Sequence, residues 1–160
     1  MKTAATFYPT DEMTDALTML GYRTSNVVFP DLMVGCPPWH RDGDDQLPAF
    51  VAEVGSTRPG LFILEAVRGL AAPRHEDYFD SLLAELEGHG YHVEWKVLDT
   101  AEPYAAEGRR RRMFIIGVRK DRLALFEDNP FEWRSAARPI WWPRGYAPSS
   151  MAQRLISGNL

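Results

Sequence analysis

The sequence predicts an α/β domain with a mostly parallel sheet and an antiparallel final strand. Three observations support this. The first is that strand-like and helix-like segments alternate along the chain. The second is that the run Leu61–Val67 is apolar on both faces, as is typical of a central parallel strand. A third is that the last two strand-like segments, Tyr91–Asp99 and Arg112–Lys120, flank an irregular loop instead of a helix. We therefore expect helices on a parallel sheet that ends in an antiparallel strand or hairpin.

The first half of the chain predicts two strands and two helices. A short strand-like start precedes a helix within Asp11–Tyr22, where apolar residues recur at helical spacing, Thr10 or Asp11 can cap the start and Gly21 ends it. A buried strand within Asn26–Gly35 should end at the Gly-Cys-Pro-Pro turn, because prolines cannot donate to a sheet ladder. The segment Asp45–Gly60 then has the pattern of a second helix.

The second half contains the clearest helix, within Glu76–Tyr91. Its apolar side chains form one stripe, and two glycines end it: Tyr78, Phe79, Leu82, Leu83, Leu86, Gly88 and Gly90. We expect residues 1–121 to form the α/β domain. We expect residues 122–160, which are rich in tryptophan and proline, to form an irregular extension packed on that domain.

Composition restricts the classes of function only weakly. The 160 residues, 45% of them hydrophobic, can bury a core, and the net charge of −4 argues against a surface that is basic throughout. One cysteine and four scattered histidines predict neither disulfides nor a metal site. We find no signal-peptide pattern and no membrane-length apolar run, so we expect a cytoplasmic protein.

Three loops are candidates for a binding site. In open sheets of this class, ligands bind beyond the carboxyl ends of the parallel strands. The loops predicted at that edge follow Val34, follow Val67, and run from Tyr8 to Glu12.

Three segments in order resemble the catalytic domain of DNA cytosine-5 methyltransferases. "DLMVGCPPW" is similar to the G-G-P-P-C-Q loop of that family, and "RPGLFILEAVRGL" is similar to its P-x-x-F-x-x-E-N-V-x-G-L strand and turn. "LLAELEGHGYHVEWKVLDTAEPYAAEGRRRRMFIIGVRKD" is similar to its helix, strand, Q-x-R-x-R loop and next strand. The resemblance implies a truncated Rossmann-like methyltransferase fold, S-adenosylmethionine as cofactor and DNA as partner.

The residues expected at the cofactor are altered. The resemblance places Phe7 and Asn159 at cofactor-binding positions, but Pro9, Asp11 and Glu12 stand where the family has glycines. Glycines let the backbone approach the cofactor, so a proline and two carboxylates disfavour binding in the usual mode.

The residues expected to carry the chemistry are only partly retained. Trp39 occupies the position of the family's nucleophilic cysteine, and Cys36 lies three residues earlier, roughly 10 Å away along extended backbone. The resemblance assigns Glu65 to the catalytic carboxyl and Arg110 and Arg112 to the two arginines of the Q-x-R-x-R loop.

Each of these residues also has a structural interpretation. Cys36 can be a buried apolar side chain, Glu65 can form an ion pair with Arg110 or Arg112, and the run Arg109, Arg110, Arg111 and Arg112 can either contact DNA phosphates or be solvated.

Three hypotheses on function follow. The first is a degenerate relative without stand-alone methyltransferase activity and without a target-recognition region, which binds DNA or a protein partner through the former active-site cleft. The second is an active S-adenosylmethionine-dependent nucleobase methyltransferase or nucleotide-modifying enzyme that uses Glu65 and the CPPW loop. The third is a structural or assembly protein that keeps only the fold. A protein partner or a homo-oligomer is expected in addition.

Overall fold

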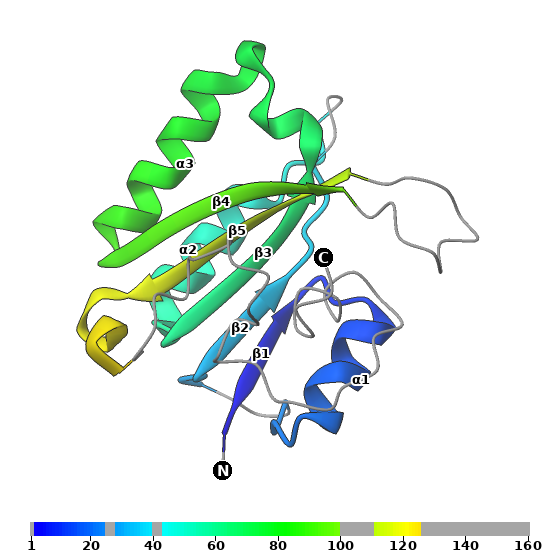
Figure 1. Ribbon diagram of the computed structural model, residues 1–160, viewed down its shortest axis with the longest axis vertical. Coiled ribbons are helices and arrows are strands. Elements are labelled where there is room, and N and C mark those ends of the chain that lie inside the picture. Colours follow the sequence, from blue (N-terminus) through cyan, green and yellow to red (C-terminus); the bar gives the residue numbers. More distant parts are fainter. Residues whose placement is uncertain (1, 25–27, 40–42, 100–110, 126–160) are drawn as a thin grey trace.

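The structure is a computed structural model that describes residues 2–24, 28–39, 43–99 and 111–125. These residues form a five-stranded sheet with the order β1-β2-β3-β5-β4 (Figure 1). The strands are β1 (Ala4–Phe7), β2 (Leu32–Gly35), β3 (Leu61–Val67), β4 (Tyr91–Asp99) and β5 (Arg111–Arg119). β1, β2 and β3 are parallel, and β5 is antiparallel to both β3 and β4, which confirms the predicted arrangement.

Helices cover both faces of this sheet. The described residues contain α1 (Asp11–Met19), α2 (Leu47–Thr57) and α3 (Glu76–Gly88), with 3₁₀ turns at Arg68–Ala71, Pro73–His75 and Lys120–Leu125. α1 packs on one face, against side chains such as Leu32 and Val34, and α2 and α3 pack on the other, against side chains such as Met33 and Phe62 (Figure 1). Successive strand residues therefore point to opposite layers.

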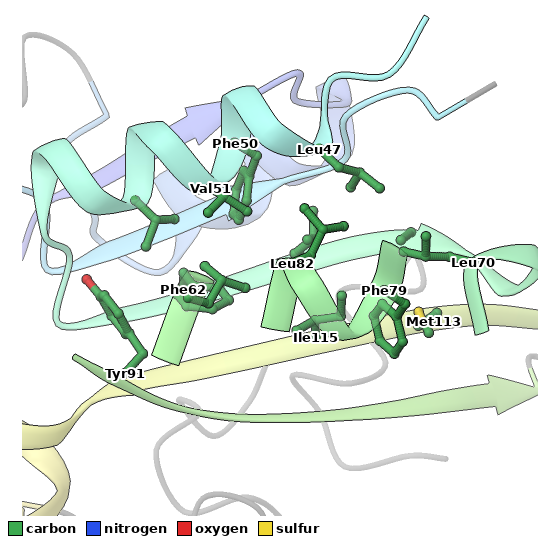
Figure 2. Packing of buried hydrophobic residues seen from close by; sticks show 14 of the residues in the cluster. Leu47, Phe50, Val51, Phe62, Leu70, Phe79, Leu82, Tyr91, Met113 and Ile115 are labelled. Atoms are coloured by element: carbon green, nitrogen blue, oxygen red, sulfur yellow. The ribbon is translucent and has the colours of Figure 1, made fainter. Parts of the chain in front are cut away.

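The larger hydrophobic cluster lies between the sheet and the pair α2–α3 (Figure 2). Phe50 and Phe62 meet edge to face with ring centroids 5.9 Å apart, and Phe62 contacts Tyr91 in the same way at 5.2 Å. The stripe predicted on α3 is present, because Phe79, Leu82 and Leu86 are buried and Tyr78 and Leu83 pack partly buried beside them. We call this cluster the α2–α3 core and the cluster on the other face the α1 core.

Local signals in the sequence explain where most elements begin and end. Thr10 caps α1, its side-chain oxygen accepting a hydrogen bond from the Met13 amide at 3.3 Å, and Gly21 follows the helix with φ +77°. α2 is shorter than predicted. It begins at Leu47, whose amide donates to Asp45 Oδ1 at 3.0 Å, and ends at Thr57, because the next residue, Arg58, has a left-handed φ of 47°.

The second strand is shorter than the sequence predicts. We expected it within Asn26–Gly35, but β2 begins only at Leu32. Pro30 cannot donate to a ladder, and the side chains of Val28 and Phe29 are exposed instead of facing either core. Apolar composition alone therefore overestimated the strand.

The parallel strands place three loops at one edge of the sheet. β1, β2 and β3 run in the same direction, so the chain leaves all three at the carboxyl edge, immediately before Tyr8, Cys36 and Arg68. Across residues 2–24, 28–39, 43–99 and 111–125, no helix is both long and apolar enough to cross a membrane.

Candidate functional site

An ion pair between Glu65 and Arg112 lies near the carboxyl end of β3. Glu65 shares its face of β3 with Ile63 of the α1 core, and Arg112 shares its face of β5 with Phe114 of the same core. Arg112 Nε lies 3.2 Å from Glu65 Oε1, and the side chains are 33% and 13% exposed. The expectation that Glu65 pairs with one of the two arginines is confirmed for Arg112.

Burial controls the protonation of Glu65. Desolvation raises the pKa of its carboxyl above the ordinary value, and the charge of Arg112 opposes that rise. Desolvation is the larger effect. The carboxyl of Glu65 therefore takes up a proton more readily than an ordinary glutamate does, beside the guanidinium of Arg112.

Cys36 lies beside this pair, which the sequence did not reveal. β2 and β3 pair in parallel with Gly35 opposite Leu64, so Cys36 follows β2 level with Glu65. Burial, reinforced by the charge of Glu65 and opposed by that of Arg112, raises the pKa of the Cys36 thiol to about 11. The thiol is therefore protonated at neutral pH and is a poor nucleophile.

Trp39 packs toward the opposite layer. Its ring meets that of His75 edge to face with centroids 4.9 Å apart, and it lies against the α2–α3 core. Glu65 and Arg112 lie on the face that α1 covers. The structure thus brings Cys36, Glu65 and Arg112 together, but it does not show Trp39 as part of that group.

The loop that carries Trp39 is attached to both helices of the α2–α3 layer. Trp39 forms an antiparallel bridge with Asp45, and the Gln46 amide donates to the Pro38 carbonyl at 3.1 Å. The Tyr78 hydroxyl donates a hydrogen bond to Asp45 Oδ2. Burial and this hydrogen bond raise the pKa of Tyr78. Sequence reasoning missed Asp45 and Tyr78, because a contact between residues 33 positions apart leaves no local pattern.

The loop after β1 differs from a glycine-rich cofactor loop. The Phe7 ring points into the α2–α3 core, where it meets Phe50 edge to face at 5.6 Å. Tyr8 has a left-handed φ of 51° and a side chain that is 51% exposed, a strained conformation for an aromatic residue. Pro9 has no backbone N–H, and the Thr10 side chain already caps α1. A ligand at this loop would therefore meet the side chains of Tyr8 and Pro9 instead of glycine backbone, and the Thr10 side chain already accepts a hydrogen bond from the first turn of α1.

Several predicted site residues lie outside the described residues. These are Arg109, Arg110 and Asn159. Arg111 begins β5, so of the predicted DNA-binding run only Arg112 has a described side chain. Residues 126–160 also lie outside, so the packing of the extension on the domain remains a prediction.

Sequence comparison shows the family. The sequence model described as C-5 cytosine-specific DNA methylase matches residues 42–152, more than half of the chain. The type II methyltransferase M.SacI of Streptomyces achromogenes is 34% identical over 115 residues, which cover 62% of this chain and 29% of that protein. M.HgiCII of Herpetosiphon aurantiacus is 37% identical over 102 residues, which cover 56% of this chain and 23% of that protein. The chain thus spans less than a third of these relatives.

Structural comparison shows the same fold. The Dnmt2 methyltransferase of S. pombe superposes with a TM-score of 0.54 at 12% identity, over 79% of this chain and 54% of that chain. A DNMT2 variant of Spodoptera frugiperda gives 0.52 at 13% identity, over 76% and 51%. A truncated Rossmann-like methyltransferase fold is therefore present.

The family match includes part of the candidate site. It begins three residues after Trp39, so it contains Glu65 and Arg112 but neither the CPPW loop nor the loop after β1. The chain belongs to the C-5 cytosine-specific DNA methylase family.

Proposed function

We propose that this chain binds DNA at the carboxyl edge of the sheet, through Glu65 and Arg112, and transfers no methyl group on its own. The observation that carries the proposal is that a carboxyl and a guanidinium remain paired in a site whose thiol has a pKa of about 11. The site keeps polar groups suited to holding a base or a phosphate but lacks a ready nucleophile.

Methyl transfer to carbon five of cytosine first needs a thiolate that adds to carbon six. At neutral pH Cys36 supplies a thiol, and Trp39, which stands where the resemblance calls for the nucleophile, supplies an indole that cannot add to a pyrimidine. The Glu65 carboxyl can still hydrogen-bond to a base edge, and Arg112 can donate to a carbonyl or phosphate oxygen. Binding is thus supported without the covalent step.

The loop after β1 gives independent support for the missing activity. S-adenosylmethionine would have to approach backbone that carries the side chains of Tyr8 and Pro9, in a loop that is rich in glycine in the family. The exposed Asp11 lies next to it, at the first turn of α1. The residues present do not suit the cofactor in the usual mode.

The decisive experiment incubates the isolated protein with radiolabelled S-adenosylmethionine and cytosine-containing DNA. We expect no label in the DNA. Transfer of label by the isolated protein would refute the absence of stand-alone activity.

A parallel binding measurement tests the DNA site itself. We expect salt-dependent binding that weakens in Arg112→Gln, because a cation beside the phosphates is lost. Arg122→Gln is the matched control, since exposed Arg122 follows β5 and so lies at the opposite edge of the sheet from the carboxyl ends of β1–β3. Equal affinities in both variants, or no binding at low salt, would reject the site and favour a purely structural protein.

The buried carboxyl favours one further candidate, a nucleobase-modifying enzyme with Glu65 as the acid. Its raised pKa is a property that general acids share. Under this alternative Glu65→Gln abolishes the base-modifying activity, while the circular dichroism spectrum shows that the domain stays folded. Retention of the activity would remove Glu65 from the mechanism.

A further inference from the structure

β4 forms an edge of the described sheet with a long, regular backbone. All nine of its residues pair with β5 in one uninterrupted register, from Tyr91 opposite Arg119 to Asp99 opposite Arg111. Among the described strands β4 has no neighbour on its other side. This strand has no bulge and no proline, and its edge is marked instead by the charged side chains of Glu94 and Lys96.

The hydrogen-bond pattern fixes which backbone groups point outward. The Lys120 amide donates to the Gly90 carbonyl at 2.9 Å, so Gly90 faces β5. Because backbone groups alternate along an antiparallel strand, Glu94 and Lys96 also bond toward β5, and the N–H and C=O groups of Trp95 point to the outer edge.

The side chains of β4 are sorted by face. The Trp95 ring lies on the α3 side, where it meets Phe79 edge to face at 5.2 Å and stays 43% exposed. Glu94 and Lys96 lie on the other side and are partly buried, with Glu94 Oε1 3.4 Å from His92 Nε2. The edge therefore carries an acid and a base two residues apart, on either side of an aromatic residue.

We propose that a second copy of this chain pairs with β4 antiparallel, on a two-fold axis at Trp95. In this register Glu94 lies opposite the partner's Lys96, and Lys96 lies opposite the partner's Glu94. The two Trp95 rings meet on the α3 side and can cover their exposed parts.

Charge selects this register over its neighbours. The outward backbone groups also permit a two-fold axis at Glu94 or at Lys96, but these place two carboxylates or two ammonium groups directly opposite each other. Like charges in that position are destabilising, whereas opposite charges stabilise. Of these three registers, only the one centred on Trp95 places opposite charges directly across from each other.

Charge reversal tests the pairing. We expect sedimentation equilibrium of the full chain without DNA to show a dimer that weakens at least tenfold in Glu94→Lys and in Lys96→Glu. The double variant Glu94→Lys with Lys96→Glu restores both cross-strand pairs and should recover the dimer. Glu87→Lys, at an exposed position on α3, is the control and should leave the dimer intact. A monomeric wild type, or a double variant weaker than both single ones, overturns the proposal.

Mixed cysteine cross-linking tests the register. In a Cys36→Ser background, Glu94→Cys and Lys96→Cys are prepared separately, so that each chain carries one thiol. Position 94 opposes position 96 of the partner, so only the mixture should form a disulfide-linked dimer rapidly. Cross-linking by either variant alone at the rate of the mixture would contradict this register. Because no DNA is present, failure here leaves the proposed DNA site untouched.

Discussion

Cys36 and Glu65 show how the neighbourhood of a residue sets its chemistry. Both lie partly or largely buried at the carboxyl edge of the sheet, and desolvation is the largest influence on the pKa of each. Arg112 opposes that influence in both cases without reversing it. The neutral forms of both acids are therefore favoured beside a single cation.

The reactivity of Cys36 should report this environment. Alkylation of the folded protein by iodoacetamide should be slow at neutral pH and rise with a midpoint near 11. The thiol of the unfolded chain ionises first, near the ordinary value of 9.0, so this group lowers the free energy of unfolding as pH rises from 9 toward 11. The same cysteine in urea is the control. A folded-state midpoint below 9 would identify an activated thiolate instead.

Removal of the Arg112 cation should destabilise the fold in a pH-dependent way. Arg112→Gln leaves Glu65 largely buried with its cation gone, and a buried polar group that loses its partner costs about 1–3 kcal/mol. The cost should be larger at pH 8 than at pH 4, because a carboxyl that takes up a proton as the pH falls no longer needs a cation. Urea denaturation at both pH values measures this. Equal losses would show that the pair contributes through packing alone.

At the scale of elements, two glycines of the sheet leave room for aromatic rings of the α2–α3 core. Gly117 in β5 lies beneath the Phe62 ring of β3, where an added Cβ would be 2.0 Å from Cε1. Gly35 is similarly covered by Phe50. The two aromatic rings of the α2–α3 core thus occupy the space that side chains at these positions would need.

Gly117→Ala should therefore overpack the core. We expect a loss of about 1–3 kcal/mol of unfolding free energy, because the Phe62 ring must leave its position. Gly88→Ala is the matched control, since nothing lies within 4 Å of a Cβ there and the residue is helical. Alanine at that position should be neutral or stabilise by up to about 1 kcal/mol. Similar urea midpoints for the two variants would contradict the close contact.

The attachment of the Trp39 loop gives a second prediction at this scale. Tyr78→Phe removes the hydroxyl that donates to Asp45, so hydrogen exchange of the Gln46 amide, which bonds to Pro38, should become faster. Tyr91→Phe removes a different hydrogen bond, 2.6 Å to the Pro59 carbonyl, and serves as the control. Tyr91→Phe should lower the free energy of unfolding by about 0.5–1.5 kcal/mol without changing hydrogen exchange of the Gln46 amide. Unchanged exchange in both variants would show that the hydroxyl does not hold the loop.

For the whole molecule, the central question is whether the shortened fold holds the cofactor of its family. A ligand that binds only the folded state must raise the melting temperature. The loop after β1, with strained Tyr8 and Pro9, leads us to expect no shift with saturating S-adenosylmethionine or its demethylated product. An active S-adenosylmethionine-dependent methyltransferase provides the positive control. A clear upward shift would support the enzymatic alternative for this chain.

Local sequence signals were sufficient for most of the elements. The spacing of apolar residues located α1 and α3, and the apolar run Leu61–Val67 located β3, because these patterns follow from the periods of helix and strand. The signals failed where neighbours far along the chain decide the outcome. β2 proved shorter than its apolar sequence, since Val28 and Phe29 face neither core.

The sequence by itself determined the family resemblance and the α/β class. It also indicated that Glu65 needs a cation as partner. Each of these depends on residues close together in the chain. Only the tertiary structure decided that the cation is Arg112, that Cys36 lies level with Glu65, and that Asp45 and Tyr78 hold the Trp39 loop. These contacts arise from strand order and register. The pairing of β2 with β3 and of β3 with β5 brings together residues whose separation in sequence carries no local signal.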